Sequence, residues 1–100
     1  MTIEEICADM SEKAGSIEPL GKTLLFRLDD ESMLLDGSGA SNTVSIVTGQ
    51  EVEAECTVRM SLDTYGKLQR KEIKHFMAVA SGKIKVVGDF SIAAKLKKLT

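Results

Sequence analysis

Few side chains in this sequence have the types and spacing that catalysis or metal binding requires. The sole histidine, His75, lies in a lysine-rich stretch without a second histidine or cysteine close to it, so a zinc-type site lacks its ligands. Carboxylates occur as a run at 29–31 and at the alternate positions 51, 53 and 55, which is typical of a turn and of a solvated strand face. We therefore predict a protein that is not an enzyme, holds no metal and needs no cofactor.

Phosphate-loop and nucleic-acid signatures are also weak. The glycine-rich segment GSGAS at 37–41 lacks the Gly-Lys-Ser/Thr ending of a phosphate loop. Nucleic-acid binding favours basic residues interleaved with aromatic ones, and this chain has one tyrosine, three phenylalanines and no tryptophan. Cys7 and Cys56 share no metal-ligand spacing, so we expect two reduced thiols and a cytoplasmic location. These features favour binding of a ligand other than nucleic acid.

The composition indicates one small folded domain with an uneven charge distribution. The chain has 100 residues, 43% of them apolar and 28% charged, which predicts a single domain over 1–100. Residues 1–50 hold three basic and nine acidic side chains, whereas residues 51–100 hold ten basic and six acidic ones. This asymmetry fits either an anion-facing surface or two solvated faces that differ by chance.

Apolar residues at helical spacing predict four helices, which would have to position any binding site. Thr2 and Glu5 form a capping-box pattern, while Ser61 and Asp89 are expected N-caps. The predicted helices span 2–14, 62–69, 73–80 and 90–99.

Alternating apolar and polar residues predict five strands. The clearest alternation runs over 51–60, where Cys56, Val58 and Met60 share one face and Arg59 lies on the other. Short turns between the first three strands favour antiparallel pairing, and a helical crossover before the last strand favours a mixed sheet. The predicted strands span 22–28, 32–36, 43–47, 51–60 and 83–87.

The fold class that follows is α+β, an α/β layer. Its order is α-β-β-β-β-α-α-β-α, with a five-stranded mixed, largely antiparallel sheet and helices on one face. Met33, Met60 and Met77 fall on the predicted apolar faces. Flexible methionine side chains suit an ordinary core and also a core that takes up a ligand, and the pattern does not distinguish the two.

The segment from Met60 to Leu99 resembles the sterol carrier protein type-two (sterol-transfer) domain family. The resemblance rests on CTVRMS followed by Asp63, on YGKL, on SGKIKVVGD and on FSIAAKLKKL, in this order. GKTLLFRLDD is similar to the first strand of the family. The sequence departs from the family where Gly-Lys and Asn-Pro are common between the two middle helices. Here those positions read Lys71-Glu72 and Lys74-His75.

The resemblance implies a sterol-carrier-like fold with a tunnel between sheet and helices for sterols, fatty acids or fatty acyl-CoA esters. We therefore expect non-enzymatic intracellular carriage of an apolar ligand, with a fatty acid or acyl-CoA as the leading candidate. The expected tunnel residues are Phe26, Met60, Leu68, Phe76, Met77, Ile84, Val86, Ile92 and Leu96. The expected headgroup or membrane contacts are Lys83, Lys85, Lys95, Lys97 and Lys98.

Two alternatives to the carrier hypothesis stay open. The same fold with a filled core would act as a structural or accessory protein-interaction module without a ligand. A small hydrolase or transferase would need clustered histidine or carboxylate side chains, which the sequence lacks. An anionic membrane surface and a lipid-metabolising enzyme are further candidate partners of a carrier.

Overall fold

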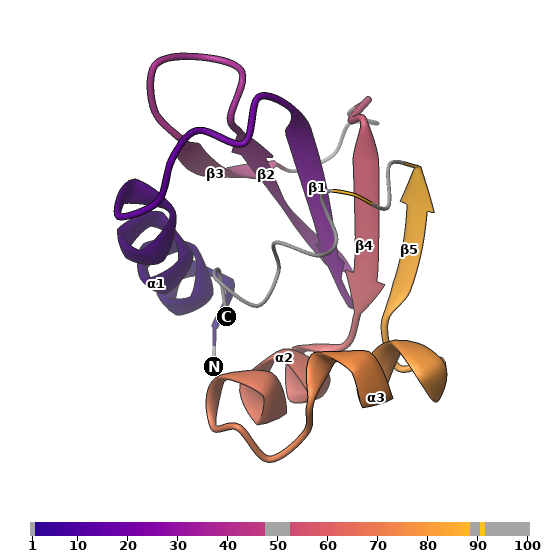
Figure 1. Cartoon of the computed structure of the whole chain (residues 1–100). Helices are drawn as coiled ribbons and strands as arrows, with labels where there is room; N and C mark the ends of the chain where they lie inside the picture. Colours follow the sequence, from indigo (N-terminus) through magenta and orange to yellow (C-terminus); the bar gives the residue numbers. More distant parts are fainter. Residues whose placement is uncertain (1, 48–52, 89–90, 92–100) are drawn as a thin grey trace.

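The computed structural model describes residues 2–47, 53–88 and 91. Helix α1 lies against one part of a five-stranded sheet, while helices α2 and α3 lie at one end of it (Figure 1). The elements are α1 (Ile3–Gly15), β1 (Thr23–Leu28), β2 (Glu31–Asp36), β3 (Thr43–Val47), β4 (Cys56–Met60), α2 (Leu62–Gln69), α3 (His75–Ala80) and β5 (Lys85–Gly88).

The sheet has the strand order β3-β2-β1-β4-β5. Strands β1, β2 and β3 pair antiparallel, which confirms the prediction from their short connections. The mixed sheet is also confirmed, but its parallel pair is β1–β4 rather than a pair formed by the last strand. Strand β5 runs antiparallel to β4, because α2 and α3 return the chain at the same end of the sheet (Figure 1).

Helix α1 begins at the capping box predicted from its sequence. The Thr2 side chain accepts a hydrogen bond from the Glu5 amide at 3.2 Å, and a Glu5 carboxylate oxygen accepts one from the Thr2 amide at 3.2 Å. These bonds satisfy amide groups that have no partner within the helix. The helix packs its buried stripe of Ile3, Ile6, Met10 and Ala14 on the sheet, over β2 and β3.

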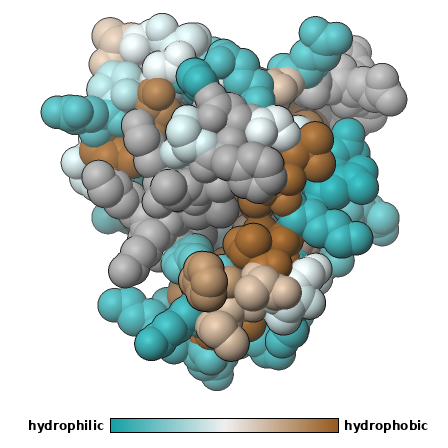
Figure 2. Space-filling view, turned by 45° about the vertical axis from the view of Figure 1, so that its right-hand side comes forward, coloured by the Kyte–Doolittle hydropathy of each residue, from teal (hydrophilic) through white to brown (hydrophobic). Residues whose placement is uncertain are grey.

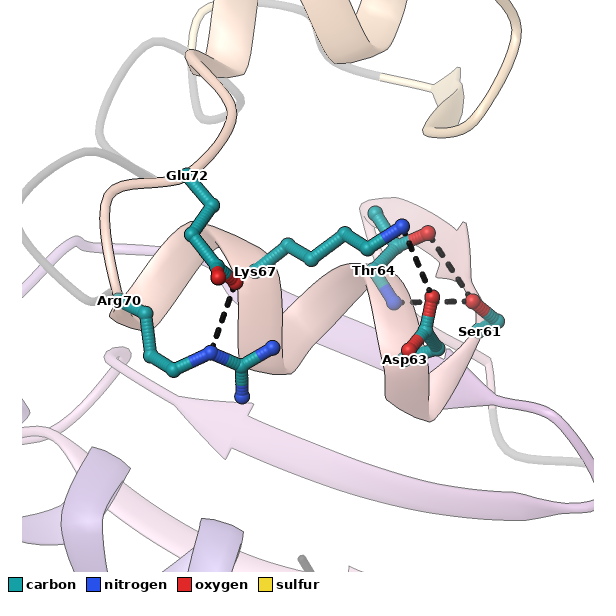
Figure 3. A network of polar contacts seen from close by, with 6 residues as sticks. All are labelled: Ser61, Asp63, Thr64, Lys67, Arg70 and Glu72. Atoms are coloured by element: carbon teal, nitrogen blue, oxygen red, sulfur yellow. Dashed lines mark hydrogen bonds and ion pairs between the residues drawn. The ribbon is translucent and has the colours of Figure 1, made fainter.

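Helix α2 begins at Ser61, as its sequence predicts. The Ser61 hydroxyl accepts a hydrogen bond from the Thr64 amide at 3.0 Å. The ion pair between Lys67 and Asp63 connects successive turns at 3.2 Å (Figure 3). Lys67 and Asp63 lie on the solvent side of α2, whereas Tyr65 on its other side is buried in the core.

The strand predicted over 51–60 is shorter in the described part of the chain. Of the described residues in the alternating segment, Cys56–Met60 form a strand, whereas residues 53–55 do not pair with a neighbouring strand. Alternation shows which residues could share a face, but a strand also needs a partner for its backbone. The predicted helix at 90–99 lies outside the described residues, apart from Ser91, which is helical.

The sheet packs one face into the core cluster, and we call this the inner face. Register-paired residues share a face, so Phe26 lies beside Met33 of β2 and Val58 of β4. All three are fully buried. The inner face and α1 join one continuous core cluster with Tyr65 of α2 and Ala78 of α3. The opposite face, which we call the outer face, presents Arg27, Arg59 and Lys85.

A glycine in β5 allows close approach of β4, and its replacement has a predictable cost. Gly88 has φ +101°, and a Cβ there would lie 2.4 Å from the Glu55 carbonyl oxygen. Gly88→Ala should lower the free energy of unfolding by at least about 2 kcal/mol in a urea titration, from backbone strain and this clash. The matched control is Gly39→Ala, where nothing lies within 4 Å. Equal stability of the two variants would contradict the prediction.

Candidate functional site

Most of the described residues that were predicted to contact an apolar ligand lie in the core. Phe26 is completely buried, and Met60, Leu68 and Ile84 are 5%, 2% and 1% exposed. Val86 is half-buried and packs against the same cluster from β5. These side chains come from β1, β4, α2, β5 and the turn before β5, so tertiary structure gathers them into one apolar region.

Phe76 and Met77 differ from their predicted interior position. They are 80% and 56% exposed, and Val79 on the same helix is 43% exposed. Only Ala78 of α3 is buried, because this six-residue helix turns a single narrow side towards the core. Figure 2 shows apolar surface at the end of the molecule where α3 lies. The predicted contacts Ile92 and Leu96 lie outside the described residues.

A polar contact connects α1 to α2 at the edge of the apolar region. Gln69 donates to an Asp9 carboxylate oxygen and, at 3.4 Å, to the Tyr65 hydroxyl. Lys13 lies 3.0 Å from the same Asp9 carboxylate. Burial, reinforced by the nearby Asp9 charge, raises the pKa of Tyr65 above its usual value. Tyr65 therefore stays protonated near neutral pH and serves as a hydrogen-bonding group.

Two of the five lysines predicted to contact a headgroup line a hollow on the outer side of the sheet. Lys83 and Lys85 are exposed, and the hollow has a volume of about 360 Å³. Lys95, Lys97 and Lys98 lie outside the described residues. The hollow is lined by Arg27, Asp29, Arg59, Met60, Gly82, Lys83 and Lys85.

Arg27 and Arg59 are the lining residues that sequence reasoning missed. The alternation over 51–60 predicted Arg59 on the solvated face of its strand, and Arg59 is exposed in the structure. The proximity of the two arginines depends on the parallel pairing of β1 with β4, which places Arg27 opposite Arg59. The sequence carries no signal for that register, although the two alternating strands show that both arginines avoid the core.

The described part of the chain contains no group of three or more histidine, cysteine or acidic side chains that could hold a metal ion. Among the described residues, neither Cys7 nor Cys56 forms a disulfide bond. Within the same described ranges, no helix has both the length and the apolar character needed to cross a bilayer.

Comparison with solved structures shows the same fold over nearly the whole chain. The crystal structure of sterol carrier protein 2 like 2 from Aedes aegypti is 21% identical, with a TM-score of 0.78, covering 98% of this chain and 95% of that one. Sterol carrier protein 2 from Aedes aegypti, in complex with the C16 fatty acid palmitate, is 19% identical, with a TM-score of 0.73 and complete coverage of both chains.

The fold also occurs inside a longer protein. A sec-alkylsulfatase from a Pseudomonas species is 18% identical, with a TM-score of 0.61 over 89% of this chain and 14% of that chain. Comparison with curated protein sequences gives no significant match. The sequence profile of the SCP-2 sterol transfer family, however, matches residues 3–100. This chain therefore belongs to the SCP-2 sterol transfer family.

Proposed function

We propose that this protein is a non-enzymatic carrier that binds a fatty acid or fatty acyl-CoA between the inner face and the helices. The observation that carries this proposal is the exposure of Phe76 and Met77 on a helix whose Ala78 is anchored in the apolar core. Large exposed apolar side chains that adjoin a core mark interaction sites. Family membership and the palmitate complex of the Aedes aegypti relative support a lipid as the ligand.

The free energy of such binding would come mainly from the acyl chain. Each buried methylene contributes about 0.8 kcal/mol, so a long chain gains on the order of 10 kcal/mol. Association itself costs about 4–15 kcal/mol. A short acyl chain gains less free energy than this cost, so it binds too weakly to be carried. The buried residues Phe26, Met60, Leu68 and Ile84, with half-buried Val86, would contact the chain after a local rearrangement of the packed core. Cys7 and Cys56 form no disulfide bond within the described residues, which supports a cytoplasmic location.

The proposal is tested by native mass spectrometry and by titration with palmitate, palmitoyl-CoA and a sterol. We expect a bound species of one lipid per chain with palmitate or palmitoyl-CoA, and extraction of the same lipid class from freshly purified protein. Absence of binding to all three ligands, by mass spectrometry and by displacement of a fluorescent fatty acid, would overturn the proposal.

Phe76→Ala should weaken palmitate binding about ten-fold without unfolding the protein. Covering a phenylalanine side chain with ligand is worth about 1.5–3 kcal/mol, which corresponds to about ten-fold or more in the dissociation constant. The matched control is Val87→Ala, because Val87 is 64% exposed and lies on the outer face of β5. Equal weakening by the two variants would show that Phe76 does not contact the lipid.

An accessory module without a ligand is the second candidate function. It is favoured by the continuous cluster of buried side chains among the described residues, and by the sec-alkylsulfatase in which the same fold is a small part of the chain. A lipid-free protein that forms a stable complex with one enzyme would support this function. A lipid that copurifies and exchanges with added palmitate would exclude it.

A further inference from the structure

The outer face carries a row of three cationic side chains across three adjacent strands. Arg27 of β1 is the register partner of Arg59 of β4, and Arg59 is the register partner of Lys85 of β5. Their chain neighbours Phe26 and Val58 point to the inner face, so the three cations share the opposite one. Adjacent strands lie about 4.8 Å apart, and the row therefore spans about 10 Å.

The row is part of a concave surface. The hollow of about 360 Å³ includes all three cations and also Lys83, and its volume lies within the range of small-molecule sites. Gly82, at φ +81°, turns the chain between α3 and β5. The amide of Lys83 then donates to the Ala78 carbonyl oxygen at 2.9 Å. This hydrogen bond fixes the backbone of Lys83, whose side chain lies at the rim of the hollow.

The positive charge of the hollow is poorly balanced by the protein itself. Within residues 2–47, 53–88 and 91, none of these four cationic side chains forms an ion pair. The hollow has one acidic lining residue, Asp29, and a carboxylate oxygen of Asp29 accepts a hydrogen bond from the Leu62 amide at 3.0 Å. Like charges on register-paired residues repel each other, so an anion bound between them would relieve that repulsion.

We propose that this hollow binds a phosphate group through Arg27, Arg59 and Lys85, with Lys83 at its rim. A phosphate monoester carries a charge of about −1.5 to −2 at pH 7, which suits several cations better than the single charge of a fatty acid carboxylate does. Each guanidinium offers a planar fork of donors that matches two phosphate oxygens. The site goes beyond the proposed lipid function, since it lies on the face opposite to the apolar core and is tested without an acyl chain.

The first test is an NMR titration of the full chain with inorganic phosphate and pyrophosphate. We expect saturable shifts that centre on residues 59 and 85, and affinity that falls as ionic strength rises. Arg59→Gln should weaken binding about ten-fold or more, because it removes charge-assisted hydrogen bonds. Lys13→Gln is the matched control, since it removes one positive charge from α1. Equal affinity of the two variants, or no saturable binding to the unmodified protein, would overturn the proposal.

The second test distinguishes two sources of the phosphate group. Vesicles of phosphatidylcholine, with and without phosphatidic acid, are sedimented with the protein and with Arg59→Gln. Binding that needs both phosphatidic acid and Arg59 identifies a lipid headgroup as the source. Arg59-dependent binding of pyrophosphate without vesicle binding identifies a soluble phosphorylated compound. If Arg59→Gln changes neither pyrophosphate binding nor vesicle binding, the site is refuted.

Discussion

Phe26→Ala is expected to lower the free energy of unfolding by about 3–5 kcal/mol, whereas Phe76→Ala should change it by less than about 0.5 kcal/mol. Phe26 is completely buried between its register partners Met33 and Val58, which are themselves completely buried. Removing its ring leaves a cavity in the core beside β1, the middle strand of the sheet. Phe76 is 80% exposed, so the same substitution there removes little packing.

The measurement is urea unfolding of the two variants and of the unmodified protein, followed by circular dichroism. The pair of variants shares one chemical change, so a difference in stability reports location alone. A loss of less than about 1 kcal/mol for Phe26→Ala would mean that the inner face is not the packed core described above. A similar large loss for Phe76→Ala would mean that α3 packs against another part of the chain.

The comparison also separates stability from lipid binding. Phe26→Ala changes both the core and the proposed lipid contact, and its effect on palmitate affinity is therefore ambiguous. Phe76→Ala leaves the core intact, so a loss of affinity in that variant reports a contact with the ligand. If both Phe76→Ala and Val87→Ala bind palmitate normally, the lipid binds without contacting α3.

Asn42→Ala is expected to lower the free energy of unfolding by about 3 kcal/mol. The Asn42 side chain is 8% exposed and makes three hydrogen bonds. Its Oδ1 atom accepts from the Leu20 amide at 2.9 Å. Its Nδ2 atom donates to the carbonyl oxygens of Ala14 and Glu18, each at 3.0 Å. Alanine would leave these backbone groups without a partner in a site shielded from water, at about 1–3 kcal/mol for each buried group.

Two further variants sharpen the test of Asn42. Asn42→Asp keeps the acceptor for Leu20 but loses both donors, so it should also be strongly destabilised at neutral pH. Ser41→Ala, at the exposed neighbouring position, should unfold within about 0.5 kcal/mol of the unmodified protein. If Asn42→Ala unfolds at the same urea concentration as Ser41→Ala, the three hydrogen bonds do not hold the β2–β3 loop against the end of α1.

Both proposed binding surfaces depend on the way in which β4 joins the sheet. The parallel pairing of β4 with β1 places Val58 beside Phe26 on the inner face and, one residue on, Arg59 beside Arg27 on the outer face. Since side chains alternate along a strand, a shift of one residue in this register would exchange the two surfaces. The apolar inner face proposed to bind lipid and the basic hollow are therefore set by the same strand pairing.

Local patterns in the sequence determined most of the elements of this protein. Thr2 and Glu5 predicted the capping box of α1, Ser61 predicted the N-cap of α2, and period-two alternation predicted the inner-face residues of β4. Such signals are local, because a cap or an alternating strand involves residues close together in the chain. The family resemblance followed from short sequence motifs such as SGKIKVVGD, and the mixed sheet followed from the order of the predicted elements.

Tertiary structure alone decided three features. The β1–β4 register brought Arg27 to Arg59 across 32 positions of sequence, and the three hydrogen bonds of Asn42 connect segments that no local pattern relates. The exposure of Phe76 was decided by the placement of α3, since an apolar stripe marks a helix face but does not supply a partner for it. The pairing of distant strands depends on packing interactions throughout the core. Because those interactions join residues far apart in the chain, no single segment of the sequence determines them.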